Sequence, residues 1–196
     1  QELGAQVITC SDSSGYVIDE AGIDLELLRE VKEVERGRVS DYAIRRGSAA
    51  TFVPGGSVWD VPVDVALPCA TQNELDGDAA AALLSNGLVA VAEGANMPCT
   101  PQAILAFQKA GVLYAPGKAS NAGGVATSGL EMSQNSMRLS WTRAEVDQRL
   151  NGIMVSIHKA CHDTAKEYGH PGNYVIGANI AGFVKVADAM LDQGIV

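Results

Sequence analysis

Residues 63–114 read VDVALPCATQNELDGDAAAALLSNGLVAVAEGANMPCTPQAILAFQKAGVLY, and this stretch decides the fold. Three short runs in it are mostly apolar throughout instead of alternating with polar residues, as is typical of strands buried in a parallel sheet. These runs lie at 63–67, 88–92 and 112–114. Stretches with helical periodicity, 76–86 and 101–110, separate them. Because strand and helix alternate, the sequence predicts an α/β fold.

Capping residues locate the ends of both helices. Asp76 precedes the first helix, and Asn86-Gly87 closes it. Thr100 places a capping hydroxyl before Pro101, a residue favoured in the first turn of a helix. Short loops between helices and strands are therefore expected.

The same alternation extends towards the amino terminus. Apolar runs at 7–10 and 51–53 are predicted to be further buried parallel strands, and helical periodicity covers 24–35 and 39–46. Residues 1–5 are expected to end a helix that feeds directly into the first of these strands. No glycine-rich turn from strand to helix precedes that strand, so part of the nucleotide-binding unit is expected to lie outside the sequence.

The last third of the chain has a different pattern. It shows no further strand after Tyr114, and three long helices are predicted at 123–139, 142–168 and 178–193. We therefore predict a doubly wound, mostly parallel, Rossmann-like domain over residues 1–120 that lacks its first strand and glycine loop. A helical segment over residues 121–196 is predicted to complete this domain.

The composition limits the classes of function. The net charge is -9 with a pI near 4.7, and the acidic residues are scattered, so we expect no nucleic-acid partner. No stretch approaches the roughly 20 consecutive apolar residues that span a bilayer, and no signal peptide begins the chain, so we expect a soluble protein without a membrane partner. The cysteines stand singly, which fits reduced thiols in a cytoplasmic protein. They are Cys10, Cys69, Cys99 and Cys161.

Ligands of an open parallel sheet bind beyond the carboxyl ends of its strands, so the residues after each strand are candidates for a binding site. The first such loop, SDSSG at 11–15, lies where a dinucleotide fold meets the adenosine ribose. A carboxylate there favours a free ribose hydroxyl, whereas serines and a nearby cation favour a phosphate. The alternative is a turn in which Asp12 and Ser13 cap backbone amides. The residues alone leave these readings open.

The next two loops carry amide and small side chains without net charge. The loop LPCATQNE at 67–74 offers the donors and acceptors that a ribose and a carboxamide need. In the loop AEGANMP at 92–98, Gly94 permits close backbone approach, and Asn96 can both donate to and accept from a planar carboxamide. For Asn96 alone, a structural asparagine turn is the alternative.

The fourth loop, PGKASNAGGVATS at 116–128, is glycine-rich and runs into a helix whose first amides favour an anion. That helix end and the Ser128 hydroxyl together suit a substrate carboxylate. Alternatively, Gly123-Gly124 lets the helix pack tightly and Ser128 bonds its own helix.

Four motifs together closely resemble the hexameric glutamate dehydrogenases of bacteria and lower eukaryotes, within the dehydrogenases that act on glutamate, leucine, phenylalanine and valine. They are VDVALPCATQNELD at 63–76, VAEGANMP at 91–98, APGKASNAGGVATSGLEMSQN at 115–135 and GANIAGFVKVADAM at 177–190. The resemblance runs the whole length of the chain. It implies an oxidoreductase that converts L-glutamate reversibly to 2-oxoglutarate and ammonia with a nicotinamide coenzyme, as a cytoplasmic homohexamer.

In that family an amino-terminal domain supplies the catalytic lysine and aspartate, so the resemblance implies no catalytic residue in this chain. It also implies that the helical segment packs toward that domain. On the substrate side it assigns Ser128 and Val125 to the pocket for the glutamate side-chain carboxylate, with Asn121 and Gly124 nearby. A serine at this place distinguishes a glutamate site from the apolar pockets of relatives that take leucine or phenylalanine, because an unpaired buried charge is costly.

For the coenzyme, the resemblance places Asn96 and Thr71 near the nicotinamide and its ribose. Residues 12–14 with Lys32 resemble the NADP-linked bacterial members, whose serine and lysine can engage the 2′-phosphate. NADP is therefore expected rather than NAD. The expected coenzyme residues are Ser11, Asp12, Ser13, Lys32, Ala70, Thr71, Gln72, Ala95 and Asn96.

Other functions remain as alternatives. His158 and His162 lie four apart on a predicted helix with Cys161 beside one of them, a spacing that can bind a metal. No glutamate completes an HExxH motif, a solvated helix face explains the pair more simply, and we expect no metal. The chain could also be a non-catalytic nucleotide-binding module or part of a related amino-acid dehydrogenase, and turnover would discriminate a bare module from an enzyme.

Overall fold

The computed structural model describes residues 1–194 of the chain. These residues form two compact units, Gln1–Val61 and Pro62–Val196, and each is described here by itself. The first contains an antiparallel sheet of three strands and the second a parallel sheet of three strands, so the chain has an α/β fold.

The sheet of the first unit is built on a hairpin. Strand β1 (Thr9–Asp12) pairs antiparallel with β2 (Gly15–Ile18), which also pairs antiparallel with β3 (Thr51–Pro54). The predicted parallel strands at 7–10 and 51–53 are therefore wrong in direction, and β2 was not predicted. The reason is the turn between β1 and β2, where the Asp12 carboxylate accepts from the backbone amide of Ser14 at 2.9 Å. A two-residue turn of this kind can join only antiparallel strands.

The helices of the first unit cover its core. Helix α1 (Leu25–Arg29) continues into the π-helical turn η1 (Glu30–Val34), so the predicted helix 24–35 is real but is α-helical only in its first half. Helix α2 (Val39–Arg46) is confirmed, and the 3-10 turns η2 (Gly47–Ala49) and η3 (Val58–Asp60) follow. Residues 1–5 form turns instead of the expected helix end. The fully buried core side chains include Val17, Val31 and Tyr42.

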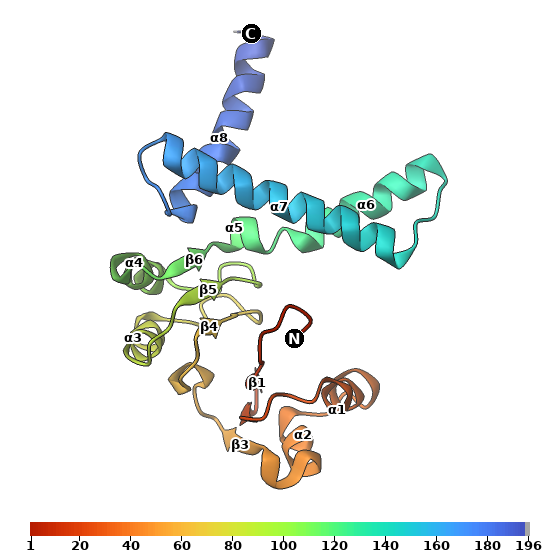
Figure 1. Cartoon of the computed structure of the whole chain (residues 1–196), viewed down its shortest axis with the longest axis vertical. Helices are drawn as coiled ribbons and strands as arrows, with labels where there is room; N and C mark the ends of the chain where they lie inside the picture. Colours follow the sequence, from red (N-terminus) through yellow and green to blue (C-terminus); the bar gives the residue numbers. More distant parts are fainter. Residues whose placement is uncertain (195–196) are drawn as a thin grey trace. The chain divides into compact units, whose positions relative to one another are not determined.

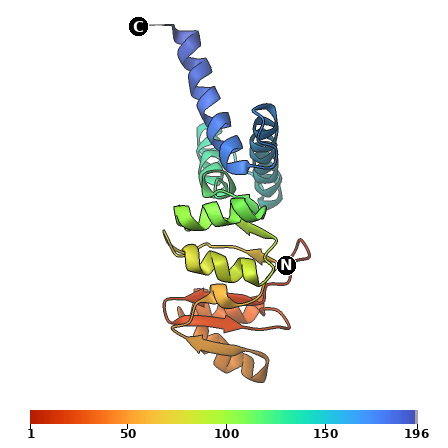
Figure 2. The same ribbon diagram turned by 90° about the vertical axis from the view of Figure 1, so that its left-hand side faces the viewer.

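The second unit begins with the predicted alternation of strand and helix. Strands β4 (Val65–Ala66), β5 (Ala90–Ala92) and β6 (Leu113–Ala115) pair in parallel in that order. Helices α3 (Gly77–Ser85) and α4 (Pro101–Ala110) connect them and lie side by side along one side of this sheet (Figures 1 and 2). The predictions for 63–114 are therefore confirmed, with strands shorter by up to three residues.

The predicted helix caps are also confirmed. The Asp76 carboxylate accepts from the amides of Asp78 and Ala79 at 3.1 and 2.9 Å. Thr100 caps α4 with its hydroxyl, and Pro101 is in the first turn. These side chains satisfy amides that have no partner within the helix, so they fix where each helix starts.

Four helices follow β6 in the part of the chain that the structure describes. They are α5 (Gly117–Ser120), α6 (Gly123–Met137), α7 (Arg143–Glu167) and α8 (Tyr174–Gln193), of which only the short α5 was not predicted. Figure 1 shows α7 as the long helix from whose ends α6 and α8 extend. Among the described residues, α8 is the one helix that is long and apolar enough to cross a membrane by length and composition, and 6% of that stretch is buried in the structure.

Candidate functional site

The loops that follow the three parallel strands are bonded to one another at one edge of the second unit's sheet. The amides of Gly94 and Ala95 donate to the carbonyl of Pro68 at 2.9 and 3.1 Å, which joins the loop after β5 to the loop after β4. Asn73 donates its amide to the carbonyl of Met97 at 3.0 Å. The structure therefore brings together the two loops that the sequence assigns to the nicotinamide end of a coenzyme.

The backbone in these two loops is unusual. Asn73 and Met97 both have positive φ, at 57° and 54°, and they are bonded directly to each other. For side-chain-bearing residues this conformation is uncommon, and it is found where the surrounding structure enforces it, often at functional sites. Two such residues in contact indicate that the shape of this loop pair is strongly constrained.

Gly94 is required for the two loops to approach. A Cβ atom at this position would lie 2.5 Å from the Sγ atom of Cys69, a distance that real Cβ atoms do not show. Gly94 therefore lets its loop pack closely against the side chain of Cys69. In these packed loops the side chains of Thr71, Gln72 and Asn96 are exposed, while Ala95 is buried.

The loop after β6 joins the same cluster. The side-chain amide of Asn121 donates to the carbonyl of Ala95 at 3.1 Å. The Ser120 hydroxyl donates to the carbonyl of Glu93 at 2.6 Å. Asn121 thus has a structural bond as well as its predicted place near the substrate, and three of the four predicted loops meet within this unit.

The start of α6 is open. A Cβ atom at Gly123 or Gly124 would meet no described atom within 4 Å, so these glycines do not serve tight packing. No side chain caps the amino end of α6. Val125 is 73% exposed and Ser128 is also exposed, while the neighbouring Thr127 hydroxyl bonds the carbonyl of Gly123. The amino end of α6 and the Ser128 hydroxyl are therefore accessible to an anion.

The first unit carries the remaining predicted coenzyme residues. The Nζ atom of Lys32 lies 3.0 Å from Oδ2 of Asp12, which also accepts from the amide of Val39 at 3.0 Å. Burial raises the pKa of the Asp12 carboxyl, but the hydrogen bonds from Ser14, Val39 and Lys32 outweigh it and hold this pKa far below its usual value. The alternative that Asp12 caps a turn is thus realised, and the same contacts bring Lys32 to the hairpin.

The loop residues Ser11, Asp12 and Ser13 do not lie at the carboxyl end of a parallel strand, contrary to the expectation for this loop. Ser11 and Asp12 belong to strand β1, and Ser13 lies in the hairpin turn, because the chain turns straight back into β2. Ser11 and Ser13 are exposed.

The sequence interpretation missed Arg38. Its Nη1 atom donates to the Ser13 hydroxyl at 2.8 Å, so a second cation joins Lys32 beside the hairpin. A signal existed in the sequence, because Arg36-Gly37-Arg38 is a basic group directly before a helix. Its partner lies 25 positions away, and only the fold shows that they meet.

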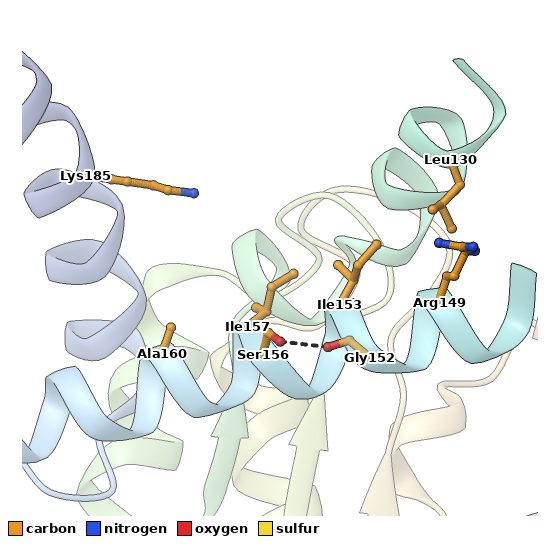
Figure 3. A pocket seen from close by; sticks show the side chains of 8 residues that line it. All are labelled: Leu130, Arg149, Gly152, Ile153, Ser156, Ile157, Ala160 and Lys185. Atoms are coloured by element: carbon orange, nitrogen blue, oxygen red, sulfur yellow. Dashed lines mark hydrogen bonds between the residues drawn. The ribbon is translucent and has the colours of Figure 1, made fainter. Parts of the chain in front are cut away.

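A shallow cavity of about 550 Å³ lies elsewhere in the second unit, between α6, α7 and α8 (Figure 3). Ile153 and Ile157 give it an apolar floor, and Arg149 and Lys185 border it. The guanidinium of Arg149 lies 4.1 Å from the ring centre of Trp141. None of the predicted binding residues lines this cavity, so it is separate from the candidate site.

The two histidines of the metal hypothesis stack on each other on α7, with ring centres 6.2 Å apart. Nε2 of His158 lies 3.1 Å from the hydroxyl of Tyr174, and Nδ1 of His162 lies 3.0 Å from Asp163. Each ring therefore has a polar partner, and Cys161 is buried. No group of three or more metal-ligating side chains occurs among residues 1–194.

A sequence profile described as "Glutamate/Leucine/Phenylalanine/Valine dehydrogenase" matches residues 1–194. The chain belongs to this family. It is 60% identical over 198 aligned residues to the "NADP-specific glutamate dehydrogenase" of Escherichia coli, covering 100% of this chain and 44% of that protein. It is 54% identical to the protein of the same name from Giardia intestinalis, with the same coverage.

Solved structures agree with the family assignment. The glutamate dehydrogenase of Plasmodium falciparum superposes with a TM-score of 0.94 at 45% identity, over 100% of this chain and 42% of that one. A glutamate dehydrogenase of Thermus thermophilus superposes with a TM-score of 0.82 at 23% identity, which bears on the fold alone. The predicted Rossmann-like α/β fold is consistent with these neighbours. The chain spans less than half the length of the curated relatives that it matches.

Proposed function

We propose that this chain is the coenzyme-binding part of a glutamate dehydrogenase that converts L-glutamate and NADP⁺ reversibly to 2-oxoglutarate, ammonia and NADPH. The names of the relatives support this proposal. The observation that carries it is the cluster of loops at one edge of the parallel sheet. The loops that carry exposed Thr71 and Asn96 are bonded to each other, and Ala95 of the second loop accepts from Asn121, which lies just before the open start of α6. This arrangement offers neutral hydrogen-bonding groups beside an anion-favouring helix end.

The coenzyme's role sets what the site must do. When bound, NADP⁺ accepts a hydride from the α-carbon of glutamate, so the reacting carbon must be held against one face of the nicotinamide. Asn96, Thr71 and Gln72 supply amide and hydroxyl groups that suit the carboxamide and ribose. The methyl side chains of Ala70 and Ala95 are too small to block the approach of the nicotinamide. Family resemblance places the catalytic lysine and aspartate outside these 196 residues.

In the first unit, the residues present fit a ribose 2′-phosphate. Lys32 and Arg38 are two cations near the exposed Ser13 hydroxyl, with Ser11 beside it. Asp12 would repel a phosphate if its charge were free, but Lys32 and the amide of Val39 neutralise part of it. We therefore infer a preference for NADP over NAD, carried by Ser13, Lys32 and Arg38.

On the substrate side, the Ser128 hydroxyl and the first amides of α6 would hold the side-chain carboxylate of glutamate. Val125 would pack against the substrate's methylene groups, and Gly124 and Asn121 would shape the backbone around it. A leucine side chain would leave Ser128 without a partner, so glutamate is the preferred substrate. For the complete protein, with whatever residues precede or follow these 196, a cytoplasmic homohexamer is part of the same proposal.

The effect of Ser128→Ala on glutamate binding tests the substrate assignment. In the complete protein we expect the KM for glutamate to rise about tenfold or more, because a hydrogen bond to a charge contributes roughly 1.5–3 kcal/mol. Ser133→Ala is the matched control, since Ser133 lies on the same helix and its hydroxyl donates to the carbonyl of Gly129 in that helix. An unchanged KM in Ser128→Ala would remove Ser128 from the substrate pocket.

A further inference from the structure

Glu93 is a buried carboxylate that the proposed function does not use. It follows strand β5, is 4% exposed, and lies in the middle of the loop cluster. Its Oε2 atom accepts from the amide of Gly117 at 2.5 Å, and its Oε1 atom accepts from the amide of Cys99 at 3.2 Å. A carboxylate so deeply buried is rare unless it has a specific task.

The two oxygens of the Glu93 side chain each accept from a backbone amide, which a carboxamide, with its one acceptor oxygen, cannot do. Burial, and next the nearby Glu93 carboxylate, raise the pKa of the Cys99 thiol and of the Tyr114 hydroxyl. None of the ion pairs among residues 1–194 includes Glu93, so amides rather than a cation compensate its charge.

The contacts of Glu93 connect the coenzyme loop to the substrate loop. Its backbone amide donates to the carbonyl of Ala115 at 3.1 Å, and its own carbonyl accepts from the Ser120 hydroxyl at 2.6 Å. With the side-chain bond to Gly117, this residue holds α5 at its first residue and its last. Helix α5 leads directly to Asn121 and to the start of α6.

The packing at Gly117 is tight. A Cβ atom on Gly117 would lie 3.0 Å from the carbonyl oxygen of Ala95 and 3.1 Å from Oε2 of Glu93. Ala95 is the residue before Asn96, and its carbonyl also receives the side chain of Asn121. A shift of α5 would therefore change the separation between the loop that carries Asn96 and the helix that carries Ser128.

We propose that Glu93 is a positioning residue that sets the distance between the nicotinamide-binding loop and the substrate-binding start of α6. It contacts neither ligand, and it acts through Gly117, Ser120 and Asn121. The proposal rests on the proposed glutamate dehydrogenase function. It adds that the two binding halves of this site are coupled through one buried carboxylate.

Glu93→Gln is the direct test, because the amide has nearly the same shape but can accept from only one of the two backbone amides. In the complete protein we expect the KM for glutamate to rise about tenfold and the KM for NADP⁺ to rise as well. Because Glu93 acts through the segment that places Ser128, the double variant with Ser128→Ala should raise the glutamate KM by much less than the product of the two single effects. Strict multiplication of the two effects would overturn the proposal.

Two further variants separate positioning from stability. In Gly117→Ala the added methyl group would press against Glu93 and Ala95 at the same junction. This variant should raise the KM for glutamate and the KM for NADP⁺. Asp19→Asn is the matched control, because Asp19 is a fully buried carboxylate of the first unit that accepts from Tyr42 and Arg46. It should lower the unfolding temperature without changing the glutamate KM. If Asp19→Asn raised the two KM values as Glu93→Gln does, the effect of Glu93→Gln would be explained by loss of stability, and the positioning role would be wrong.

Amide hydrogen exchange on the 196-residue chain tests the same contacts without any activity. In Glu93→Gln at least one of the amides of Gly117 and Cys99, the one that loses its acceptor, should exchange about tenfold faster or more, and those of α3 should not change. Unchanged exchange at both amides would overturn the positioning role. Absence of glutamate turnover in the unsubstituted complete protein would instead refute the proposed function, while the exchange result would still decide the role of Glu93.

Discussion

At the scale of single residues, the proposed preference for NADP rests on two cations that the fold brings to one hairpin. Lys32 is bonded to Asp12, and Arg38 is bonded to Ser13. Neither pairing can be recognised from spacing, because the partners lie 20 and 25 positions apart and their approach is a product of tertiary structure. The family resemblance supplied Lys32, whereas Arg38 was found only from its hydrogen bond.

Replacing these cations should weaken NADPH binding selectively. We expect Lys32→Ala and Arg38→Ala each to raise the Kd for NADPH about tenfold, because each removes a charge-assisted contact to the 2′-phosphate, and to leave the Kd for NADH nearly unchanged. Fluorescence titration of the 196-residue chain with both coenzymes measures this. Lys109→Ala, a change in the last turn of α4 in the other unit, is the control. Equal losses for NADH and NADPH would show that the two cations do not contact the phosphate.

The buried Asp19 should make the chain sensitive to acid. Burial raises the pKa of its carboxyl, but hydrogen bonds from Arg46 and Tyr42 outweigh it and lower this pKa below the usual value. A lowered folded-state pKa means that the stabilisation is present above the unfolded-state pKa of about 3.9 and is lost as the pH falls further. We expect the free energy of unfolding, measured with urea, to decrease below about pH 4. The Asp19→Asn variant should be less stable at neutral pH, and its free energy of unfolding should fall less steeply as the pH is lowered. An equally steep fall would mean that other carboxylates cause the acid sensitivity.

At the scale of helices and strands, the sequence predicted those elements that have strong local signals. Residues 63–114 combine buried apolar runs with Asp76 and Thr100 as caps, and each element was found close to its observed bounds. The hairpin at 11–15 was missed because serine, aspartate and glycine suit both a ligand loop and a tight turn. Helix α5 was missed because four residues are too few to show a helical period.

Part of the candidate site could not be predicted for a related reason. Local sequence identified the four loops, but the bonds that hold them together join backbone groups, such as the carbonyls of Pro68 and Ala95. Bonds to backbone groups leave no pattern of residue types in a sequence. Glu93 bonds to the backbone amides of Gly117 and Cys99, so its proposed role could be inferred only from the fold.

The crossing of α7 and α8 gives a test of packing at this scale. A Cβ atom on Gly177 would lie 2.0 Å from the backbone carbonyl oxygen of Cys161, so Gly177→Ala should force the two helices apart and destabilise the chain by about 1–3 kcal/mol. Gly182→Ala on the same helix meets no described atom and should stabilise by roughly 0.5–1 kcal/mol. Thermal unfolding of both variants measures the contrast. Equal melting temperatures would mean that this crossing is not close-packed in solution.

At the scale of the whole molecule, these 196 residues contain the proposed coenzyme and substrate contacts but, by family resemblance, no catalytic lysine. We therefore expect the chain alone to bind NADPH weakly and not to turn over glutamate. Coenzyme titration and a spectrophotometric assay of NADPH formation measure the two properties. Glutamate-dependent NADPH formation by the 196-residue chain would place a catalytic group among these residues.

The complete protein provides the most direct measurement of the central claim. Initial rates of coenzyme reduction should be measured with L-glutamate, L-leucine, L-phenylalanine and L-valine, each with NADP⁺ and with NAD⁺. We predict that kcat/KM is highest for glutamate with NADP⁺, by at least about a hundredfold over the apolar amino acids, because Ser128 and the start of α6 would otherwise lack a partner. A higher kcat/KM for an apolar amino acid, or no turnover of any of the four, would contradict the account.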